Sequence, residues 1–144
     1  MLSLHPQGRG RNYTPLRGVV ESALRLAYAG DWPGWLWGQL PGRCEVRVWR
    51  EILPIAGLRN PLRIGFASDL HIGPTTPPAL LERAFQVLAE AHPDLLVLGG
   101  DYVFLDATPA RAETLRRLVA SVPARTKVAV LGNHDLWTHH GLLE

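Results

Sequence analysis

Three short stretches of the sequence decide the fold. They are LRIGFASDLHI at residues 62–72, PDLLVLGGDY at residues 93–102 and TKVAVLGNHD at residues 126–135. Each contains an apolar run of strand length and ends in polar residues, which is typical of a buried strand that leads into a loop. The runs predict strands at Leu62–Ser68, Leu95–Leu98 and Lys127–Leu131.

Two helical patterns separate these strands. Thr76 before two prolines predicts a helix start, and the apolar residues that follow recur at helical spacing: Leu81, Ala84, Phe85 and Leu88. Thr108-Pro109 opens the second helix, which Pro123 stops, and its inner face holds Ala112, Leu115, Leu118 and Val119. Alternating strands and helices predict an α/β fold, a βαβαβ unit with parallel strands and right-handed crossovers.

Polar residues follow each predicted strand. The first is followed by Asp69 and His71, the second by Asp101, and the third by Asn133, His134 and Asp135. The intervals from Asp69 to Asp101 and from Asp101 to Asn133 are both 32 positions, the length of a βαβ unit. Ligands in open α/β sheets bind beyond the carboxyl ends of the strands, so we expect these side chains to meet at one sheet edge.

The residue types indicate a metal site with oxygen and nitrogen ligands. Carboxylates, an imidazole and an amide oxygen suit Mn²⁺, Fe or Zn²⁺ better than Ca²⁺. Asp69 and His71 can point at one ion if the chain stays extended there, and Asp101, on the central strand, can share its oxygens between two ions. Gly100 and Gly132 allow tight turns before the ligands. Each motif alone is more often a turn or a helix cap, but three in register favour a metal site.

The ordered motifs carry a family resemblance. Asp-x-His, Gly-Asp and Gly-Asn-His-Asp, each after a strand, resemble the signature of the calcineurin-like metallophosphoesterases over about Leu62 to Trp137. The narrower forms resemble a bacterial membrane-associated branch that includes UDP-2,3-diacylglucosamine pyrophosphatase-like enzymes. The resemblance implies the N-terminal half of a β-sandwich flanked by helices. It also implies metal-dependent hydrolysis of phosphodiester or pyrophosphate bonds at a two-metal centre.

The resemblance also implies a role for each site residue. It assigns four ligands: Asp69 and His71 to the first metal, Asp101 as the bridge between the metals, and Asn133 to the second metal. His134 resembles the catalytic histidine, which stabilises the transition state or protonates the leaving oxygen, and Asp135 supports the ligands from behind. The cofactors implied are two divalent ions, with Mn²⁺ favoured and Fe or Zn²⁺ as alternatives.

The chain departs from the family pattern in one respect. The pattern continues with further histidines, including a Gly-His-x-His segment, that complete both metals, and this segment does not occur in the 144 residues. We therefore expect residues 44–144 to form a truncated metallophosphoesterase domain that is inactive in isolation. An α/β module that binds metal or nucleotide without catalysis is the alternative from another class.

The N-terminal third follows a different pattern. Residues 1–15 are rich in Gly, Pro and Arg and predict a disordered lead. Residues 16–43 predict a peripheral segment with a helix at 16–29, a break at Pro33-Gly34, and three Trp within six positions. Residues 45–52 alternate as an edge strand would. The Trp residues indicate either packing against the domain or contact with a membrane surface.

Charge and composition limit the partners. Residues 1–63 hold nine Arg and four acids, whereas residues 64–144 hold six basic residues and nine acids. The acidic part suits a cation site, although ordinary surface variation gives the same pattern. The net charge of +2, without a basic, aromatic-interleaved stretch near the motifs, speaks against nucleic acid and a nuclease. Cys44, as the one cysteine, cannot form an internal disulfide.

The partner and location expected from the sequence follow from the resemblance. The substrate is a phosphoester that is lipid-linked or contains a nucleotide. No run reaches the roughly 20 apolar residues of a membrane span, and Arg residues crowd the start of the chain, where a secretory signal needs an apolar run. We therefore expect a cytoplasmic protein at the inner face of the membrane.

Overall fold

The computed structural model describes residues 14–138 and 140–143. Most of the expected disordered lead, residues 1–15, lies outside this range. The elements follow in chain order: α1 (Pro15–Ala27), α2 (Trp32–Gly38), β1 (Ile64–Ala67), α3 (Pro78–Glu90), β2 (Leu95–Leu98), α4 (Pro109–Ser121), β3 (Thr126–Ala129), α5 (Asn133–Leu136) and the 3₁₀ helix η1 (His140–Leu142).

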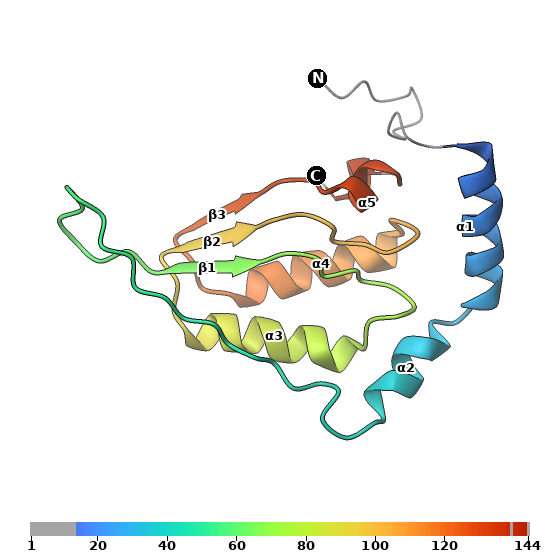
Figure 1. The fold of residues 1–144 in the computed structure, drawn as a ribbon, viewed down its shortest axis with the longest axis horizontal. Helices are drawn as coiled ribbons and strands as arrows, with labels where there is room; N and C mark the ends of the chain where they lie inside the picture. Colours follow the sequence, from blue (N-terminus) through green and yellow to red (C-terminus); the bar gives the residue numbers. More distant parts are fainter. Residues whose placement is uncertain (1–13, 139, 144) are drawn as a thin grey trace.

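The three strands form one parallel sheet in the order β1-β2-β3, so β2 is central as predicted. Phe66 of β1 and Val128 of β3 lie opposite Val97 of β2 in register. Helices α3 and α4 pack against each other on one side of the sheet (Figure 1). The α/β prediction and its βαβαβ order are thereby confirmed.

The core lies between the sheet and these two helices. The inward residues of the helices and of the central strand share it, among them Phe85, Leu96, Leu98 and Leu118, and Val122 directly after α4 is also fully buried. Gly65 faces the same layer, because a side chain there would contact Leu88 and Pro93. The predicted inner faces of α3 and α4 therefore form the core.

One of the two predicted helix caps is present. The Thr108 side chain accepts a hydrogen bond from the Arg111 backbone N–H and caps α4. Thr76 does not cap α3, because Pro77 occupies the cap position and makes no side-chain bond. Pro78 at the first helical position starts the helix through its fixed φ angle alone.

The second face of the sheet is open within the described part of the chain. It carries large apolar side chains that remain about half exposed or more: Ile64, Phe66, Val128 and Val130. All four residues of β3 are exposed, so the prediction of a third buried strand was wrong. β3 is an edge strand whose four residues are all exposed, and an apolar run cannot by itself reveal how much of a strand its neighbours cover.

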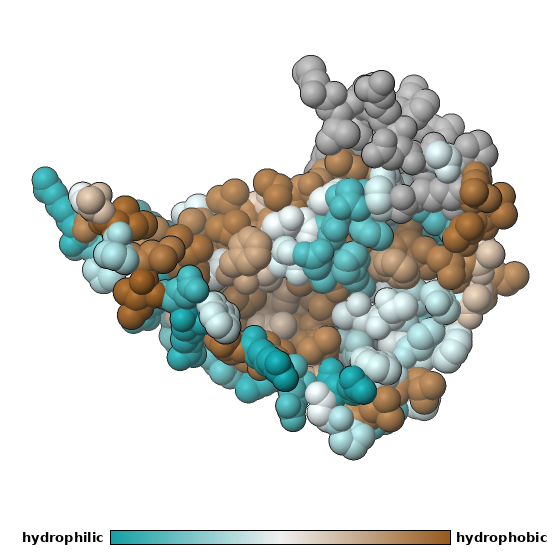
Figure 2. Space-filling model, viewed as in Figure 1, coloured by the Kyte–Doolittle hydropathy of each residue, from teal (hydrophilic) through white to brown (hydrophobic). Residues whose placement is uncertain are grey.

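Residues 45–52 form no strand, although their alternation predicted one. The side chain of Ile52 is 96% exposed and no neighbouring strand pairs with the segment. Alternation describes a strand only where a partner strand supplies the hydrogen bonds. Figure 2 shows hydrophobic residues on the adjoining segment that projects at the left of the view, where Leu53 and Ile55 are exposed.

The expected break at Pro33-Gly34 was also wrong, since both residues lie in α2. Pro33 falls in the first turn, where its missing N–H costs no helical hydrogen bond. Gly34 is buried, and its N–H donates to the Pro74 carbonyl at 2.6 Å. The pair therefore starts a helix and docks it on the loop after β1.

We expect the two faces of the sheet to respond differently to substitution. Leu96→Ala leaves a cavity in the core and should lower the free energy of unfolding by about 2–5 kcal/mol. Phe66→Ala removes an exposed side chain and should cost less than about 1 kcal/mol while reducing self-association. Urea unfolding and sedimentation velocity measure both effects. Equal losses of stability would mean that another layer covers Phe66 in solution.

Candidate metal centre

The loops after β1 and β2 lie side by side and continue the parallel pairing beyond the sheet. The backbone N–H of Asp69 donates to the Gly100 carbonyl at 3.0 Å, and that of His71 donates to the Asp101 carbonyl at 3.0 Å. A parallel bridge then joins Ile72 to Val103. These bonds fix the positions of three predicted site residues relative to one another.

The backbone at these residues is left-handed. The φ angles of Asp69, His71 and Asp101 are 56°, 44° and 55°. The chain is therefore not extended from Asp69 to His71, which was the condition given for both side chains to point at one ion. Left-handed φ costs a non-glycine residue about 1–3 kcal/mol and clusters at functional sites. The loop-to-loop hydrogen bonds hold this conformation.

His71, Asp101 and His134 form a group that could hold a metal ion. One ligand atom from each lies within 4.8 Å of the others. The two imidazole rings meet edge to face with their centroids 4.8 Å apart. His71 Nδ1 is buried and has no hydrogen-bond partner among the described atoms. A buried, unpartnered imidazole nitrogen beside a carboxylate fits a metal ligand better than a core histidine, whose nitrogens are usually satisfied.

The other two predicted ligands lie next to this group. Asp69 Oδ1 is 3.8 Å from His71 Nε2, and the Asp69 carboxylate accepts a hydrogen bond from the Ser68 hydroxyl. Asn133 is exposed at the start of α5, directly before His134. The structure thus brings His134, expected as the catalytic histidine, into the donor group itself. The ligand roles of Asp69 and Asn133 remain predictions.

The Asp135 carboxylate joins the loop after β2 to the loop after β3 through hydrogen bonds. Its side chain is fully buried. Oδ1 accepts from the backbone N–H of Tyr102 at 2.8 Å and of Val103 at 3.3 Å, and Oδ2 accepts from that of Gly132 at 2.9 Å. Burial raises the pKa of this carboxyl group, while the hydrogen bonds from the backbone oppose the rise.

Tyr102 is a supporting residue that the sequence analysis did not identify. Its hydroxyl donates to the Val130 carbonyl at 2.6 Å, so it ties the end of β2 to the end of β3. Burial raises the pKa of Tyr102, and the charge of Asp135 adds to the rise. The phenol therefore stays a neutral donor. A tyrosine after Gly-Gly-Asp gives no signal of this contact in the sequence.

Gly100 and Gly132 permit the close approach of the loops, as expected. Gly100 has φ 92°, and a side chain there would collide with the Gly132 backbone. A side chain at Gly132 would overlap Asp101 Oδ1. Asp101 Oδ1 also accepts from the His134 backbone N–H at 2.8 Å, which fixes the carboxylate in the donor group.

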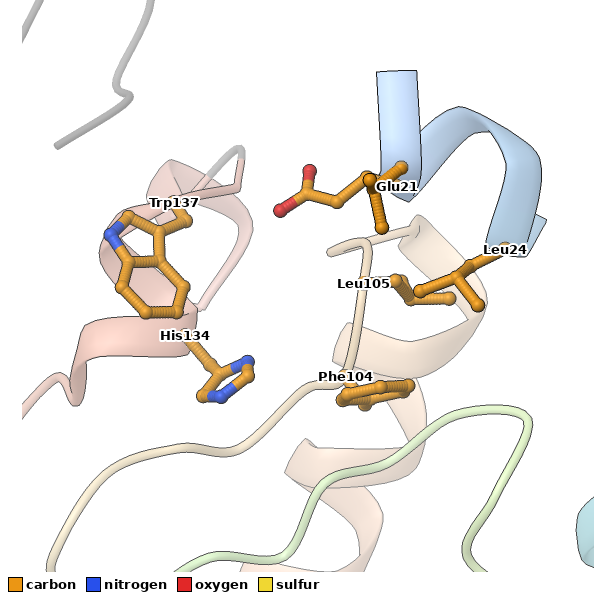
Figure 3. A pocket seen from close by; sticks show the side chains of 7 residues that line it. Glu21, Leu24, Phe104, Leu105, His134 and Trp137 are labelled. Carbon is orange, nitrogen blue, oxygen red and sulfur yellow. The ribbon is translucent and has the colours of Figure 1, made fainter. Parts of the chain in front are cut away.

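The N-terminal segment forms ion pairs with the loop after β2 and with α4. In α1, Arg25 Nε lies 2.7 Å from Asp106 Oδ2, and Asp31 before α2 pairs with Arg111 at 3.0 Å. Between α1 and the site lies a cavity of about 190 Å³ (Figure 3). It is lined by Val20, Glu21, Leu24, Phe104, Leu105, His134 and Trp137. No pattern in the sequence indicates that α1 borders the candidate centre.

The sequence matches a known protein family over the range that contains the candidate centre. Residues 62–144, more than half of the chain, match the family of calcineurin-like phosphoesterases. The chain belongs to the calcineurin-like phosphoesterase family. The matched range contains every residue of the candidate centre, and the members of this family are phosphoesterase hydrolases that use divalent metal ions. The resemblance stated from the motifs is therefore confirmed.

Individual relatives extend the similarity. The UDP-2,3-diacylglucosamine pyrophosphatase LpxG of Chlamydia trachomatis is 38% identical over 125 residues, which cover 83% of this chain and 37% of the relative. The phosphodiesterase YaeI of Escherichia coli K12 is 37% identical over 78 residues, or 52% of this chain and 28% of the relative. A Danio rerio transmembrane protein with a metallophosphoesterase domain is 31% identical over 101 residues, or 69% of this chain and 22% of the relative.

The chain therefore spans less than two fifths of the length of each of these relatives. No solved structure gives a significant match to the chain.

We expect Gly132→Ala to weaken metal binding. The new methyl group would displace Asp101 Oδ1 and should reduce Mn²⁺ affinity by about 10-fold to 100-fold, the usual range for disturbing the residues that orient a ligand. Gly141→Ala is the matched control, because a side chain there meets nothing within 4 Å. Calorimetric titration with Mn²⁺ measures both, and equal affinities would show that Asp101 does not contribute to the site.

Proposed function

We propose that this protein takes part in metal-dependent hydrolysis of phosphodiester or pyrophosphate bonds at a two-metal centre. The observation that carries the proposal is the group of His71, Asp101 and His134 at the carboxyl edge of a parallel sheet. Asp69, His71, Asp101 and Asn133 would be the ligands from this chain, and His134 would lie beside them as the catalytic histidine. Asp101 would bridge the ions, because a carboxylate offers several lone pairs. The hydrogen bond from the His134 backbone N–H to Oδ1 uses one of them, and the others can face the ions.

The residues of the chain would have different roles in such a reaction. When bound, divalent ions, with Mn²⁺ favoured over Fe or Zn²⁺, polarise the phosphoryl oxygens and make a water molecule acidic enough to attack at neutral pH. The His134 imidazole would stabilise charge on the phosphoryl group or donate a proton to the leaving oxygen. Asp135 acts through other groups, since it fixes the loops that carry Asp101 and His134.

The proposed substrate is a phosphoester that is lipid-linked or contains a nucleotide. The support comes from a relative named for UDP-2,3-diacylglucosamine, whose name combines a nucleotide, a pyrophosphate and two acyl groups. The aligned region covers 83% of this chain. The relative named as a phosphodiesterase supports the same bond type.

The proposed location is the inner face of a membrane. In the part of the chain that the structure describes, no helix has both the length and the apolar character needed to cross a bilayer. Exposed indole rings on α2 support peripheral contact, since Trp35 is 65% exposed. The Arg43 guanidinium lies 4.3 Å over the Trp37 ring. Such pairs of Trp and Arg suit the headgroup region of an anionic bilayer.

The Asp101→Asn variant tests the metal-binding part of the proposal. The 144-residue chain should bind Mn²⁺ weakly, and Asp101→Asn should weaken binding most among the ligand variants, because Asp101 is the proposed bridge. Glu113→Gln is the control, since Glu113 is exposed on α4 and pairs with Arg116. Calorimetry gives the affinities, and an unchanged affinity in Asp101→Asn would refute the assignment.

Hydrolysis of bis(p-nitrophenyl) phosphate tests the activity. We expect the 144 residues alone to hydrolyse this substrate slowly, because they lack the Gly-His-x-His segment that completes both metals in the family pattern. A metal ion held by too few ligands is poorly positioned, and misplacement of a reacting group by about 1 Å can cost roughly 10²-fold in rate. In a protein that spans the full length of such relatives, His134→Ala should lower kcat more than Mn²⁺ affinity. Inactivity of that protein with Mn²⁺, Fe²⁺ and Zn²⁺ alike would favour the non-catalytic module instead.

Flotation with vesicles tests the proposed membrane contact. The double variant Trp35→Ser/Trp37→Ser should float less than the unchanged protein with vesicles rich in phosphatidylglycerol, because the indole rings supply the interfacial affinity. Trp49→Ser is the matched control, since Trp49 is exposed but lies outside α2. If the double variant floats as well as the unchanged protein, α2 does not rest on the membrane.

A further inference from the structure

We propose that α1 forms one wall of a substrate subsite, and that this subsite takes the uncharged alkyl or acyl chain of a phosphoester. The subsite is the cavity of about 190 Å³ between α1 and α5. The inference rests on the proposed function, because it places the phosphate at the donor group of His71, Asp101 and His134. It assigns Val20 and Leu24 as residues that determine specificity.

The His134 ring connects the cavity to the metal centre. It lines the cavity and also belongs to the donor group. Its centroid lies 4.8 Å from that of His71 and 4.9 Å from that of Trp137. A phosphoester whose phosphate lies at the donor group therefore has its nearest substituent beside the cavity.

Among the described residues, the lining of the cavity is mainly apolar. Leu24 from α1, Phe104 and Leu105 from the loop after β2, and Trp137 after α5 surround the same space (Figure 3). Leu105 has φ 70°, an unfavourable conformation for leucine that the surrounding structure must hold in place. An apolar lining favours an uncharged hydrocarbon group over a sugar or a base.

One acidic side chain also lies at the cavity. Glu21 lines the cavity, is only 8% exposed as a residue, and directs its carboxylate toward the space beside Trp137 (Figure 3). An Arg25 guanidinium nitrogen lies 3.9 Å from Glu21 Oε2 on the same helix. Glu21 and His134 are the polar residues among the described lining, and the other five are apolar.

The wall formed by α1 is anchored to the loop that forms the opposite wall. Arg25 Nε lies 2.7 Å from Asp106 Oδ2, and Asp106 directly follows Leu105. Both side chains of this pair are partly buried. This ion pair links α1 to the loop that carries Phe104 and Leu105, on the opposite side of the cavity.

Binding of methyl phosphate and hexyl phosphate in the presence of Mn²⁺ tests the subsite. We expect hexyl phosphate to bind at least about tenfold more tightly, which corresponds to burial of roughly two methylene groups. Leu24→Gln makes the wall polar and Val20→Phe fills the cavity, so both should bring the two affinities together. Leu26→Gln is the matched control, because Leu26 lies on the same helix, is 81% exposed and does not line the cavity.

Calorimetry gives the affinities, and circular dichroism confirms that each variant is folded. A hexyl preference that survives both Leu24→Gln and Val20→Phe overturns the subsite while leaving the proposed function intact. Phenyl phosphate serves as a third ligand. If phenyl phosphate but not hexyl phosphate binds more tightly than methyl phosphate, and Leu24→Gln abolishes that difference, the subsite does not take an alkyl or acyl chain. Methyl phosphate binding that needs no Mn²⁺ and is unchanged in Asp101→Asn overturns the proposed function itself.

Discussion

The candidate centre depends on the buried carboxylate of Asp135. Its oxygens accept three backbone hydrogen bonds, from Tyr102, Val103 and Gly132, and so join the loops after β2 and β3. Burying a carboxylate is costly unless its lone pairs are satisfied, and a backbone N–H left without its acceptor costs about 1–3 kcal/mol. The carboxylate therefore holds the two loops in one arrangement, which sets the positions of Asp101 and His134.

The donor groups lie on backbone that is locally unfavourable but held from outside. Asp69, His71 and Asp101 all have left-handed φ angles, although none of them is glycine. Two sets of hydrogen bonds hold this backbone conformation. One set pairs the loop after β1 with the loop after β2, and the other joins the loop after β2 to the Asp135 carboxylate. A site assembled this way keeps its ligands in place before any ion arrives, which reduces the ordering needed on binding. Local rules of backbone preference are broken here because the surrounding contacts outweigh them.

The sequence predicted the βαβαβ order, the central position of β2 and the meeting of His71, Asp101 and His134, because strand periodicity and βαβ length fix where strand ends lie. It did not predict the left-handed turn at Asp69, which arises from pairing with the next loop, or the exposure of β3, which depends on what covers the second face. The wrong strand at 45–52 shows the same limit. Periodicity records the preferences of one segment, whereas pairing and covering depend on segments far away in the sequence.

The docking of α1 belongs to the contacts that no local pattern could reveal. Arg25 and Asp106 are 81 positions apart in the sequence, yet their ion pair brings the helix to the mouth of the centre. In consequence His134 faces the donor group on one side and the α1 cavity on the other. In our proposal, the residues at the sheet edge supply the chemistry, and α1, which borders the space beside His134, selects the substituent of the phosphoester.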